Sequence, residues 1–477
     1  MFRSSVLLVL LYFCVATESF GFRGFHYKGR NEPIVKSKRL FDEKWIEQPL
    51  DHFDVTNNNT WKMRYYENNE FFNGNGSIFI MLGGESPITT GYLLVGQLYE
   101  NAKKHNGIMY YTEHRYYGKS HPVENTTVEN LLFLNVDQAL ADAAYFIETK
   151  KRQLNIPNSK VFVFGGSYAG NMAAWMRIKY PHLITGAIAS SAPILAKADF
   201  FEYYEVVAKS LEKYDKKCTE NIKEAFDYIE SLINNPSGLE KLKNSFNLCD
   251  TPNATIDGQM GWIGNSIAEI FAGTVQYNAI YPDGKSDISK ICDKMMAPSY
   301  NSSFDRIAAI IREPECKDWD YNSFLKLYKN TSWNSKLIIM RLWYYQTCTE
   351  YGYYQTSNSK NSIFGKLFDL DLFTQICTDL YGKYFDIDLL NKSVRRTNVM
   401  YGGNKPDVKN VVFINGDVDP WHKLSVLKNL NDYSPAFLIK GTSHCDDLGP
   451  ELPGDTEELV QTRKIYSSII NNWINDY

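Results

Sequence analysis

The chain has 477 residues, of which 44% are hydrophobic and 14% aromatic, enough apolar material for a large globular core. Its 51 Lys and Arg stand against 55 Asp and Glu, which gives a formal net charge of −4. This balance, without any long run of basic residues, excludes the positively charged footprint of a protein that binds nucleic acid.

The N-terminal residues have the pattern of a secretory signal peptide. Arg3 precedes an apolar run over 6–16, and small residues follow between 17 and 21. The run is too short to cross a bilayer, and an amphipathic core helix explains this order of residues less well. We predict a signal peptide over residues 1–19 and a secreted or lysosomal protein. No later segment is long and apolar enough to span a membrane, and the C-terminus lacks a lipid-anchor tail, so we expect no membrane anchor.

Cysteines and sequons agree with export. Of the eight cysteines, Cys14 would leave with the signal peptide, and six of the other seven lie between residues 218 and 377. Such a local set in a secreted chain predicts a disulfide framework. Seven Asn-X-Ser/Thr sequons predict a glycosylated surface, at Asn58, Asn75, Asn125, Asn253, Asn301, Asn330 and Asn391.

From residue 77 the chain alternates short apolar strands with helical stretches. Strands are predicted over 77–82, 108–112, 161–164 and 183–189, and helices over 135–150 and 171–179. Alternation of this kind predicts a parallel sheet covered by helices.

The character of the sequence changes after Pro193. Residues from about 197 to 400 are rich in Tyr, Lys, Asn and Cys, and helical patterns dominate. The earlier rhythm then returns, with strands at 411–414 and 436–439, a helix at 424–430, and a closing helix at 456–474 with Asp455 as its cap. We therefore predict one α/β domain in two parts, residues 20–195 and 401–477, interrupted by a disulfide-stapled helical cap over 196–400.

A glycine-rich turn follows the strand at 161–164. Gly165-Gly166-Ser167-Tyr168-Ala169-Gly170 stands between a buried strand and a helix, the context of a nucleophile elbow. Such a turn projects the serine hydroxyl above the sheet and requires small neighbours. The usual glycine two residues after the serine is Ala169 here, and an ordinary βα turn is the alternative interpretation. The context favours the elbow, so the sequence predicts an α/β-hydrolase fold with Ser167 as its nucleophile.

A serine nucleophile needs a histidine base, and in this fold the chain order is Ser, then Asp or Glu, then His. Three histidines follow Ser167. His182 lies at the end of the elbow's own helix and His422 in the turn after the strand at 411–414, whereas His444 follows the last strand. Because the base belongs on the loop after the last strand, we assign this role to His444.

The acid that orients the histidine is expected at the carboxyl end of the preceding strand. Residues 415–421, Asn-Gly-Asp-Val-Asp-Pro-Trp, contain two candidates, Asp417 and Asp419. The pattern alone does not choose between them, and the other aspartate is expected to be a turn residue that binds backbone.

Two backbone amides are expected to bind the oxyanion. One belongs to Tyr168, the residue after the nucleophile, and the other to the turn that follows the strand at 77–82. Gly84 is the candidate there, although the glycines of this turn could merely make it tight. Each such donor stabilises the tetrahedral intermediate by about 3–4 kcal/mol.

Several segments together resemble a family of serine carboxypeptidases that includes prolyl carboxypeptidase, lysosomal dipeptidyl peptidase and thymus-specific serine protease. They are Gln48-Pro49-Leu50-Asp51-His52-Phe53, Leu82-Gly83-Gly84-Glu85, Glu113 to Ser120, the elbow, Ser190-Ser191-Ala192-Pro193, and Asn415-Gly416 with Asp419-Pro420-Trp421. In this family the acid directly precedes Pro-Trp, which implies Asp419. Ala169 and the helix Ala173-Ala174-Trp175 look most like thymus-specific serine protease, which makes Ala169 a mark of a subfamily.

The resemblance implies an exopeptidase that cleaves peptide substrates near a chain end, after proline or a similar small residue, through an acyl-enzyme and without metal or cofactor. The direction, carboxy- or aminoterminal, stays open. Asn171 stands where we expect an apolar residue at a proline pocket, which speaks against a strict proline preference. The family also implies the disulfides Cys218–Cys292, Cys249–Cys316 and Cys348–Cys377, and this leaves Cys445 unpaired beside His444.

Glu85 and Trp421 are the candidates for the lining of the substrate pocket. Trp421 could offer a flat face to a proline ring or pack in the core. Glu113-His114-Arg115 could bind a chain end, but a Glu–Arg pair at a strand end more often belongs to a satisfied network, and we prefer that interpretation.

Two other functions fit part of the pattern. An esterase or lipase on the same fold is opposed by the stapled cap and the family segments, and a catalytically silent peptide-binding protein is opposed by the intact Ser167, Asp419 and His444. The sequence has neither metal-ligand spacing nor a phosphate-binding glycine loop. It leaves open whether the chain forms homodimers.

Overall fold

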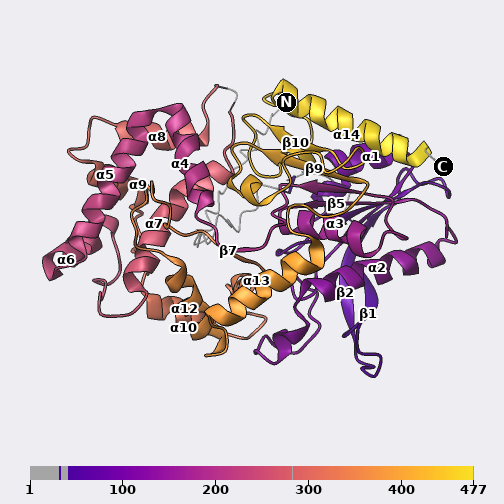
Figure 1. The fold of residues 1–477 in the computed structure, drawn as a ribbon, viewed down its shortest axis with the longest axis horizontal. Helices are drawn as coiled ribbons and strands as arrows, with labels where there is room; N and C mark the ends of the chain where they lie inside the picture. Colours follow the sequence, from indigo (N-terminus) through magenta and orange to yellow (C-terminus); the bar gives the residue numbers. More distant parts are fainter. Residues whose placement is uncertain (1–31, 34–40, 282, 476–477) are drawn as a thin grey trace, which may run out of the picture.

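Two lobes make up the molecule, one built around a β-sheet and one made of helices (Figure 1). The computed structural model describes residues 32–33, 41–281 and 283–475, so the predicted signal peptide lies outside the described residues. The sheet lobe is called the body below, and the segment 197–401, which lies between two adjacent strands of the sheet, is called the cap. Within the described ranges, no helix combines the length and apolarity needed to cross a membrane.

The body contains an eight-stranded sheet with the order β1-β2-β4-β3-β5-β6-β9-β10. Strands β1, β2 and β4 pair antiparallel, and all other neighbours pair parallel. The strands are β1 Lys44–Pro49, β2 Thr60–Asn68, β3 Ile78–Leu82, β4 Ile108–Thr112, β5 Val161–Gly166, β6 Gly186–Ser190, β9 Val411–Gly416 and β10 Ala436–Ile439. This sheet is that of an α/β-hydrolase, and the predicted fold class is confirmed.

Alternate side chains of the strands point to opposite faces of the sheet, and each face has its own core. In β3, Phe79 and Met81 pack with helices α1 and α14 on one face, whereas Ile78 and Ile80 pack with α2 and α3 on the other. The body helices are α1 Gln97–Lys104, α2 Val136–Gln153, α3 Tyr168–Lys179 and α14 Glu457–Asn475, with 3-10 turns η1 Gly91–Leu93, η2 Asn130–Phe133, η4 Pro420–Leu424 and η5 Asp446–Leu448. Because both faces are covered, the parallel strands are apolar throughout.

The helix predicted over 424–430 is wrong. The turn η4 ends at Leu424, and irregular chain follows. The Asn415 side-chain amide donates to the Val426 carbonyl at 3.1 Å, so the backbone here is bound by a neighbouring strand and not by helical bonds. This tertiary contact outweighs the helical spacing of the apolar residues.

The residue that caps the N-terminus of the closing helix α14 also differs from the prediction. The Thr456 hydroxyl accepts the Leu459 amide at 3.2 Å, as a helix N-cap does. Asp455 instead forms an ion pair with Arg463.

The cap consists mainly of amphipathic helices. They are α4 Glu202–Tyr214, α5 Lys216–Leu232, α6 Pro236–Phe246, α7 Gln259–Gln276, α8 Asp287–Met296, α9 Ser303–Ile311, α10 Tyr321–Tyr328, α11 Ile338–Gln346, α12 Leu370–Tyr381 and α13 Ile387–Tyr401. Helix α5 shows the pattern, because it buries Ile222, Phe226 and Ile229 at helical spacing. All three disulfides that the resemblance implies are present, and all lie in the cap: Cys218–Cys292, Cys249–Cys316 and Cys348–Cys377.

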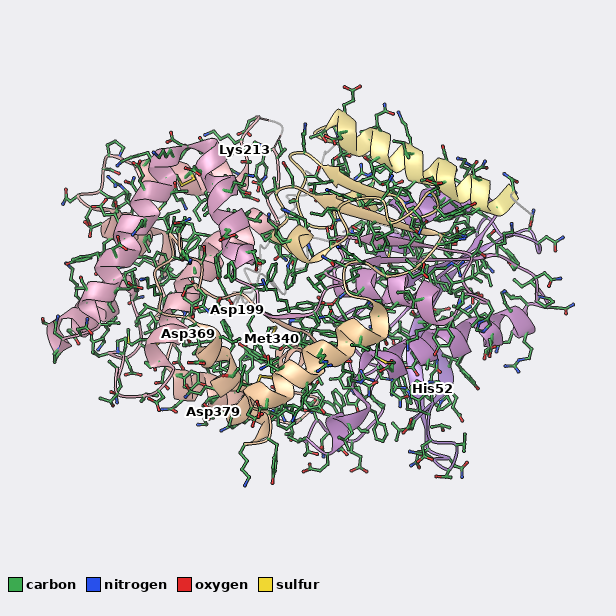
Figure 2. All side chains as sticks on the ribbon, in the orientation of Figure 1. His52, Asp199, Lys213, Met340, Asp369 and Asp379 are labelled. Carbon is green, nitrogen blue, oxygen red and sulfur yellow. A yellow bond between two sulfur atoms is a disulfide. The ribbon has the colours of Figure 1, made fainter. Side chains whose placement is uncertain are left out.

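The cap joins the body through a small sheet and a returning helix. Strands β7 Lys197–Asp199 and β8 Gly352–Tyr354 pair parallel, and Asp199, labelled between the lobes in Figure 2, accepts a hydrogen bond from Asn358 at 2.9 Å. Helix α13 then runs back to the body (Figure 1), where Tyr401 stacks on Trp175 of α3 with ring centroids 4.3 Å apart.

Helix α11 continues into a π-helix, η3 Thr347–Tyr351. Such wide turns are rare and frequently lie at functional sites. This one carries Cys348, which is tied to α12 by its disulfide, and Glu350, which faces the N-terminus of α2 in the body.

Candidate active site

Ser167 stands at the turn between β5 and α3 with backbone angles φ 58° and ψ −129°. A residue with a side chain rarely adopts this conformation, and neighbouring bonds hold it in place. The Ser167 amide donates to the Ser190 carbonyl at 2.9 Å, and the Asn171 amide donates to the Ser167 carbonyl at 3.1 Å. The turn therefore has the strained geometry of a nucleophile elbow.

Close packing explains the small residues of this turn. A Cβ on Gly165 would lie 2.0 Å from the Ala169 carbonyl oxygen, and one on Gly166 would lie 2.9 Å from Sγ of Cys445. Ala169 has room for its methyl group because it faces a glycine: even a Cβ built on Gly84 would lie 3.5 Å away, an ordinary contact. The alanine in place of the usual glycine thus fits without a clash.

The side chains of His444 and Asp419 form a buried pair. Nδ1 of His444 lies 2.8 Å from Oδ2 of Asp419, and neither side chain is more than 1% exposed. The other carboxylate oxygen accepts the Trp421 amide at 3.0 Å, so the carboxylate is held in one orientation. Asp417, the second candidate acid, is partly exposed and accepts the Gly441 amide at 2.6 Å. The structure therefore brings Asp419 to His444 and leaves Asp417 as a turn residue.

Asp419 also affects the protonation of His444. Burial disfavours the imidazolium, but the negative charge and the hydrogen bond of Asp419 outweigh it, so the pKa of His444 lies well above its ordinary value. The neutral fraction of His444 therefore increases with pH, and an imidazole can accept a proton only in its neutral form.

The cap supplies two contacts to His444 that the sequence did not reveal. The His444 amide donates to the Gln276 carbonyl at 3.0 Å, and its ring packs edge-on against Tyr277 with centroids 5.8 Å apart. Both residues lie at the end of α7, far from His444 along the chain. Only the packing of the cap against the body brings them together.

The other histidines after Ser167 are not placed to act on it. His182 is exposed, and Nδ1 of His422 lies 2.7 Å from the Asp419 carbonyl oxygen. Ser167 and His444 themselves share no hydrogen bond among the described contacts. In hydrolases this bond often tightens only when substrate is bound.

Backbone amides are available on both sides of Ser167. The Tyr168 amide opens α3 directly after Ser167. In the turn after β3, the Gly83 amide already donates to the Thr112 carbonyl at 2.8 Å, whereas Gly84 lies against the start of α3, 3.5 Å from the Ala169 nitrogen when measured from an ideal Cβ. Gly84 is thus the glycine of this turn that remains a candidate donor.

A buried network connects the Tyr168 side chain to the cap. The Tyr168 hydroxyl lies 3.0 Å from Nε2 of His114 and accepts a hydrogen bond from the Gln346 side chain, also at 3.0 Å. Gln346 donates to Glu350 at 3.2 Å as well, and Glu350 accepts the Val136 amide at 2.9 Å. Burial lowers the pKa of His114 to about 4, so this imidazole is neutral. Its Nδ1 donates to the Arg115 carbonyl at 2.6 Å, which leaves Nε2 as the acceptor for the tyrosine.

Glu113 and Arg115 belong to satisfied networks, in agreement with the structural interpretation. Glu113 accepts hydrogen bonds from Arg64 and from the Ser120 hydroxyl, the latter at 2.8 Å. Arg115 binds both oxygens of Asp142, at 2.6 and 2.8 Å. The polar groups of Glu113 and Arg115 are therefore engaged within the body.

A cavity of about 320 Å³ opens beside Ser167. Its wall includes Ser167, Gly84, Glu85, Tyr277 and Cys445. Burial raises the pKa of Glu85 to about 7, and the charge of nearby His444 opposes that shift. The structure thus places Glu85, one of the two candidate pocket residues, in the same cavity as Ser167.

Trp421, the other candidate, lies outside that wall. Its indole packs against Phe200 and Tyr203 of the cap, and its N–H donates to the Gln276 side chain at 2.8 Å. This position corresponds to the core-packing interpretation. Asn171 is also fully buried, and its amide donates to the Tyr353 hydroxyl at 3.2 Å.

Cys445 is free and buried in the wall of the cavity. Its amide donates to the Ser191 hydroxyl at 2.9 Å, and burial raises the pKa of its thiol. A raised pKa keeps the thiol protonated and weakly nucleophilic.

The sequons lie at the surface. Six of the seven asparagines are exposed and Asn125 is partly exposed, so each accords with the predicted glycosylation.

The chain is similar to known proteins over nearly its whole length. Residues 48–466 match the family described as serine carboxypeptidase S28. The chain is 32% identical to thymus-specific serine protease of Mus musculus, over 91% of this chain and 87% of that protein. It is 31% identical to the Homo sapiens protein of the same name, over 90% and 86%. With lysosomal Pro-X carboxypeptidase of Pongo abelii it shares 28% identity, over 100% of this chain and 98% of that protein.

Proposed function

The chain belongs to the serine carboxypeptidase S28 family and is a serine peptidase, and from this we propose that Ser167 is its nucleophile, His444 its general base and Asp419 the acid that orients His444. The observation that carries the proposal is the buried His444–Asp419 pair, 2.8 Å long, on the loops that follow β10 and β9. Ser167 occupies the strained turn after β5, at the same edge of the sheet. Nucleophile, acid and base thus follow the order of the fold.

In the proposed reaction, His444 takes the proton of the Ser167 hydroxyl as the oxygen attacks the carbonyl carbon of the scissile bond. The amides of Tyr168 and Gly84 bind the oxyanion. The C–N bond then breaks, His444 gives the proton to the leaving amine, and an acyl-enzyme remains. Water, deprotonated by His444, hydrolyses this ester. Asp419 stabilises the imidazolium in both steps, and no cofactor takes part.

We propose further that the enzyme is an exopeptidase. The cap contacts His444 through Gln276 and Tyr277, and the cavity of about 320 Å³ is at the small end of the range of ligand pockets, about 300–1,000 Å³. A peptide chain end fits such a site better than the middle of a folded chain. The relatives named Pro-X carboxypeptidase support cleavage after proline, whereas the buried amide of Asn171 argues against a strict requirement.

Features of export support our proposal for the compartment. The predicted signal peptide, the exposed sequons and the three disulfides all support a secreted or lysosomal enzyme.

A fluorophosphonate probe tests the nucleophile. We expect the native wild type to be labelled, and both the heat-denatured protein and the Ser167→Ala variant to stay unlabelled. An unlabelled wild type would contradict the assignment of Ser167.

A peptide library, read by mass spectrometry, tests the exopeptidase mode. We expect shortening from one terminus. Internal cleavage alone would overturn the exopeptidase proposal, and turnover of acyl esters with no peptide cleaved would favour an esterase.

A further inference from the structure

The charged side chains in the described wall of the cavity beside Ser167 are all acidic. Two carboxyl side chains, Glu85 and Glu32, belong to its wall, and no Lys or Arg does among the residues that the structure describes. The rest of the wall is apolar or neutral, with tyrosines such as Tyr92 and Tyr277. Within the described part of the chain, the wall therefore offers a ligand group two carboxyl side chains and no Lys or Arg side chain.

The two carboxyl groups differ in their protein partners. Glu32 accepts hydrogen bonds from the hydroxyls of Thr89 and Tyr111, so its oxygens are engaged. For Glu85, no other described side chain donates a hydrogen bond to the carboxyl or forms an ion pair with it, and the charge of nearby His444 lowers its pKa. Glu85 is thus the carboxyl with free capacity to bind a ligand.

The position of Glu85 along the chain links it to the reacting atoms. It directly follows Gly84, which packs on the first turn of α3, and Ser167 precedes that turn. Its charge also acts on the hydroxyl groups of Tyr168 and Tyr277, two residues that flank the nucleophile and the base. A group bound to Glu85 is therefore held close to the scissile bond.

We propose that Glu85 binds the free α-ammonium group of the substrate, so that the enzyme removes a short fragment from the amino end of a peptide. This rests on the proposed function and settles the direction that the family leaves open. An ammonium group gains a charge-assisted hydrogen bond from Glu85. A substrate carboxylate in the same cavity would instead face two carboxyl groups, with no Lys or Arg in the described part of the wall, and like charges repel.

The direction fixes which fragment stays on the enzyme. Ser167 forms an ester with the carbonyl carbon of the aminoterminal fragment, the C–N bond breaks, and the shortened peptide leaves as an amine with the proton from His444. Glu85 holds the ammonium group of the acyl part until water releases it. In a carboxypeptidase the end-binding group would instead hold the leaving amino acid.

One peptide in four forms tests the proposal: free at both ends, N-acetylated, C-amidated, and blocked at both ends. For the wild type we expect N-acetylation to lower kcat/KM by about 100-fold, since it removes one partner of a desolvated charge pair. Amidation is expected to change it less than about twofold. Loss of activity on amidation, with acetylation tolerated, would overturn the proposal and show the carboxyl direction.

Variants locate the effect. We expect Glu85→Gln to lower kcat/KM for the free peptide by about 100-fold and to erase the difference between free and acetylated forms. Glu85→Asp, which keeps the charge, should restore part of the difference in kcat/KM between the free and acetylated peptides. The matched control is Glu148→Gln, an exposed glutamate on α2 that should behave as the wild type. Discrimination that survives in Glu85→Gln would contradict the role of Glu85.

A binding measurement on the wild type avoids any folding defect of the variants. Free dipeptides should slow the labelling of Ser167 by a fluorophosphonate at much lower concentration than their N-acetylated forms, and equal protection would overturn the proposal.

The outcomes of these experiments also distinguish a failure of the role of Glu85 from a failure of the proposed function. Shortening from the carboxyl end leaves the proposed function intact and rejects only the role of Glu85, whereas absence of both labelling and peptide cleavage rejects the proposed function.

Discussion

The body and the cap contribute to the site in different ways. The body holds Ser167, Asp419 and His444, each on a loop at the carboxyl edge of the sheet. The cap holds Gln276 and Tyr277, which contact His444, and it holds Gln346 and Glu350, which bind Tyr168 and Val136 of the body. The comparison teaches that the proposed chemistry and its positioning reside in separate parts of the chain. Changes in the body should abolish turnover, and changes in the cap should reduce it.

The largest effect is expected from the acid in the body. Asp419→Asn should lower kcat by about 10⁴-fold, because the amide no longer fixes the reactive tautomer of His444. Asp417→Asn is the matched control two residues away. It should stay within a few-fold of wild type because the described contacts of its carboxylate are the Gly441 amide and, at 4.0 Å, Lys213. Steady-state kinetics on one peptide measures kcat for both variants. Similar losses of kcat in the two would contradict the assignment of Asp419.

Next in size is the removal of a disulfide from the cap. Cys218 and Cys292 are 74 residues apart, and opening a loop of that length is expected to cost about 4 kcal/mol of stability. In a variant with serine at both positions, hydrogen exchange should accelerate in α5 and α8 while β5 stays protected. If the strands lost protection to the same extent, the two lobes would unfold as one unit. The body and the cap would then not differ in stability.

A smaller effect concerns pH. Burial raises the pKa of Glu350 from 4.5 to about 7, so the folded protein keeps a proton there that the unfolded chain releases. The stabilising contribution is complete below about pH 4.5 and is lost as the pH rises through 7, by up to about 3 kcal/mol. His114 acts in the opposite sense, because burial lowers its pKa to about 4. The readout is therefore the difference between wild type and Glu350→Gln.

Thermal unfolding of both proteins between pH 4.5 and 8 gives this difference. We expect the wild type to lose stability relative to Glu350→Gln as the pH rises. A constant difference across the range would mean that Glu350 is ionised in the folded protein.

The smallest effect is expected for Gln346, which positions Tyr168 from the cap. Gln346→Leu should lower kcat by about tenfold with little change in KM, because it removes one hydrogen bond that orients the residue of the oxyanion amide. Gln259→Leu is the control: this glutamine is also buried in the cap, but it binds Tyr321 and Trp319. Equal losses in both variants would reduce the role of Gln346 to general stability.

The body could be predicted from sequence because its signals are local. Apolar runs of strand length and the glycine turn around Ser167 depend on a few adjacent residues, and the chain order of the fold left His444 as the base. The acid could not be predicted from the local pattern alone, since Asp417 and Asp419 both fitted it. Asp419 was selected only by the family resemblance. The contact at 2.8 Å with His444 supports the same choice.

The contacts of the cap could not be predicted because they are distant along the chain. Gln346 and Tyr168 are 178 residues apart, and nothing near either residue indicates that they meet. Trp421 illustrates the same limit: a pocket wall and a core position both fit its sequence, and packing against Phe200 and Tyr203 placed it in the core. Residues 424–430 fail as a helix for a related reason, the tertiary bond from Asn415.

The π-helix at Thr347–Tyr351 has a consequence for how this protein can vary in length. Deletion of one residue there would restore ordinary helical bonding and rotate the rest of the segment by about 100°. Glu350 would then turn away from the Val136 amide of the body. We therefore expect natural insertions and deletions to accumulate in exposed loops of the cap, such as the one between α5 and α6. We expect them to be absent from η3, where Glu350 binds the Val136 amide of the body.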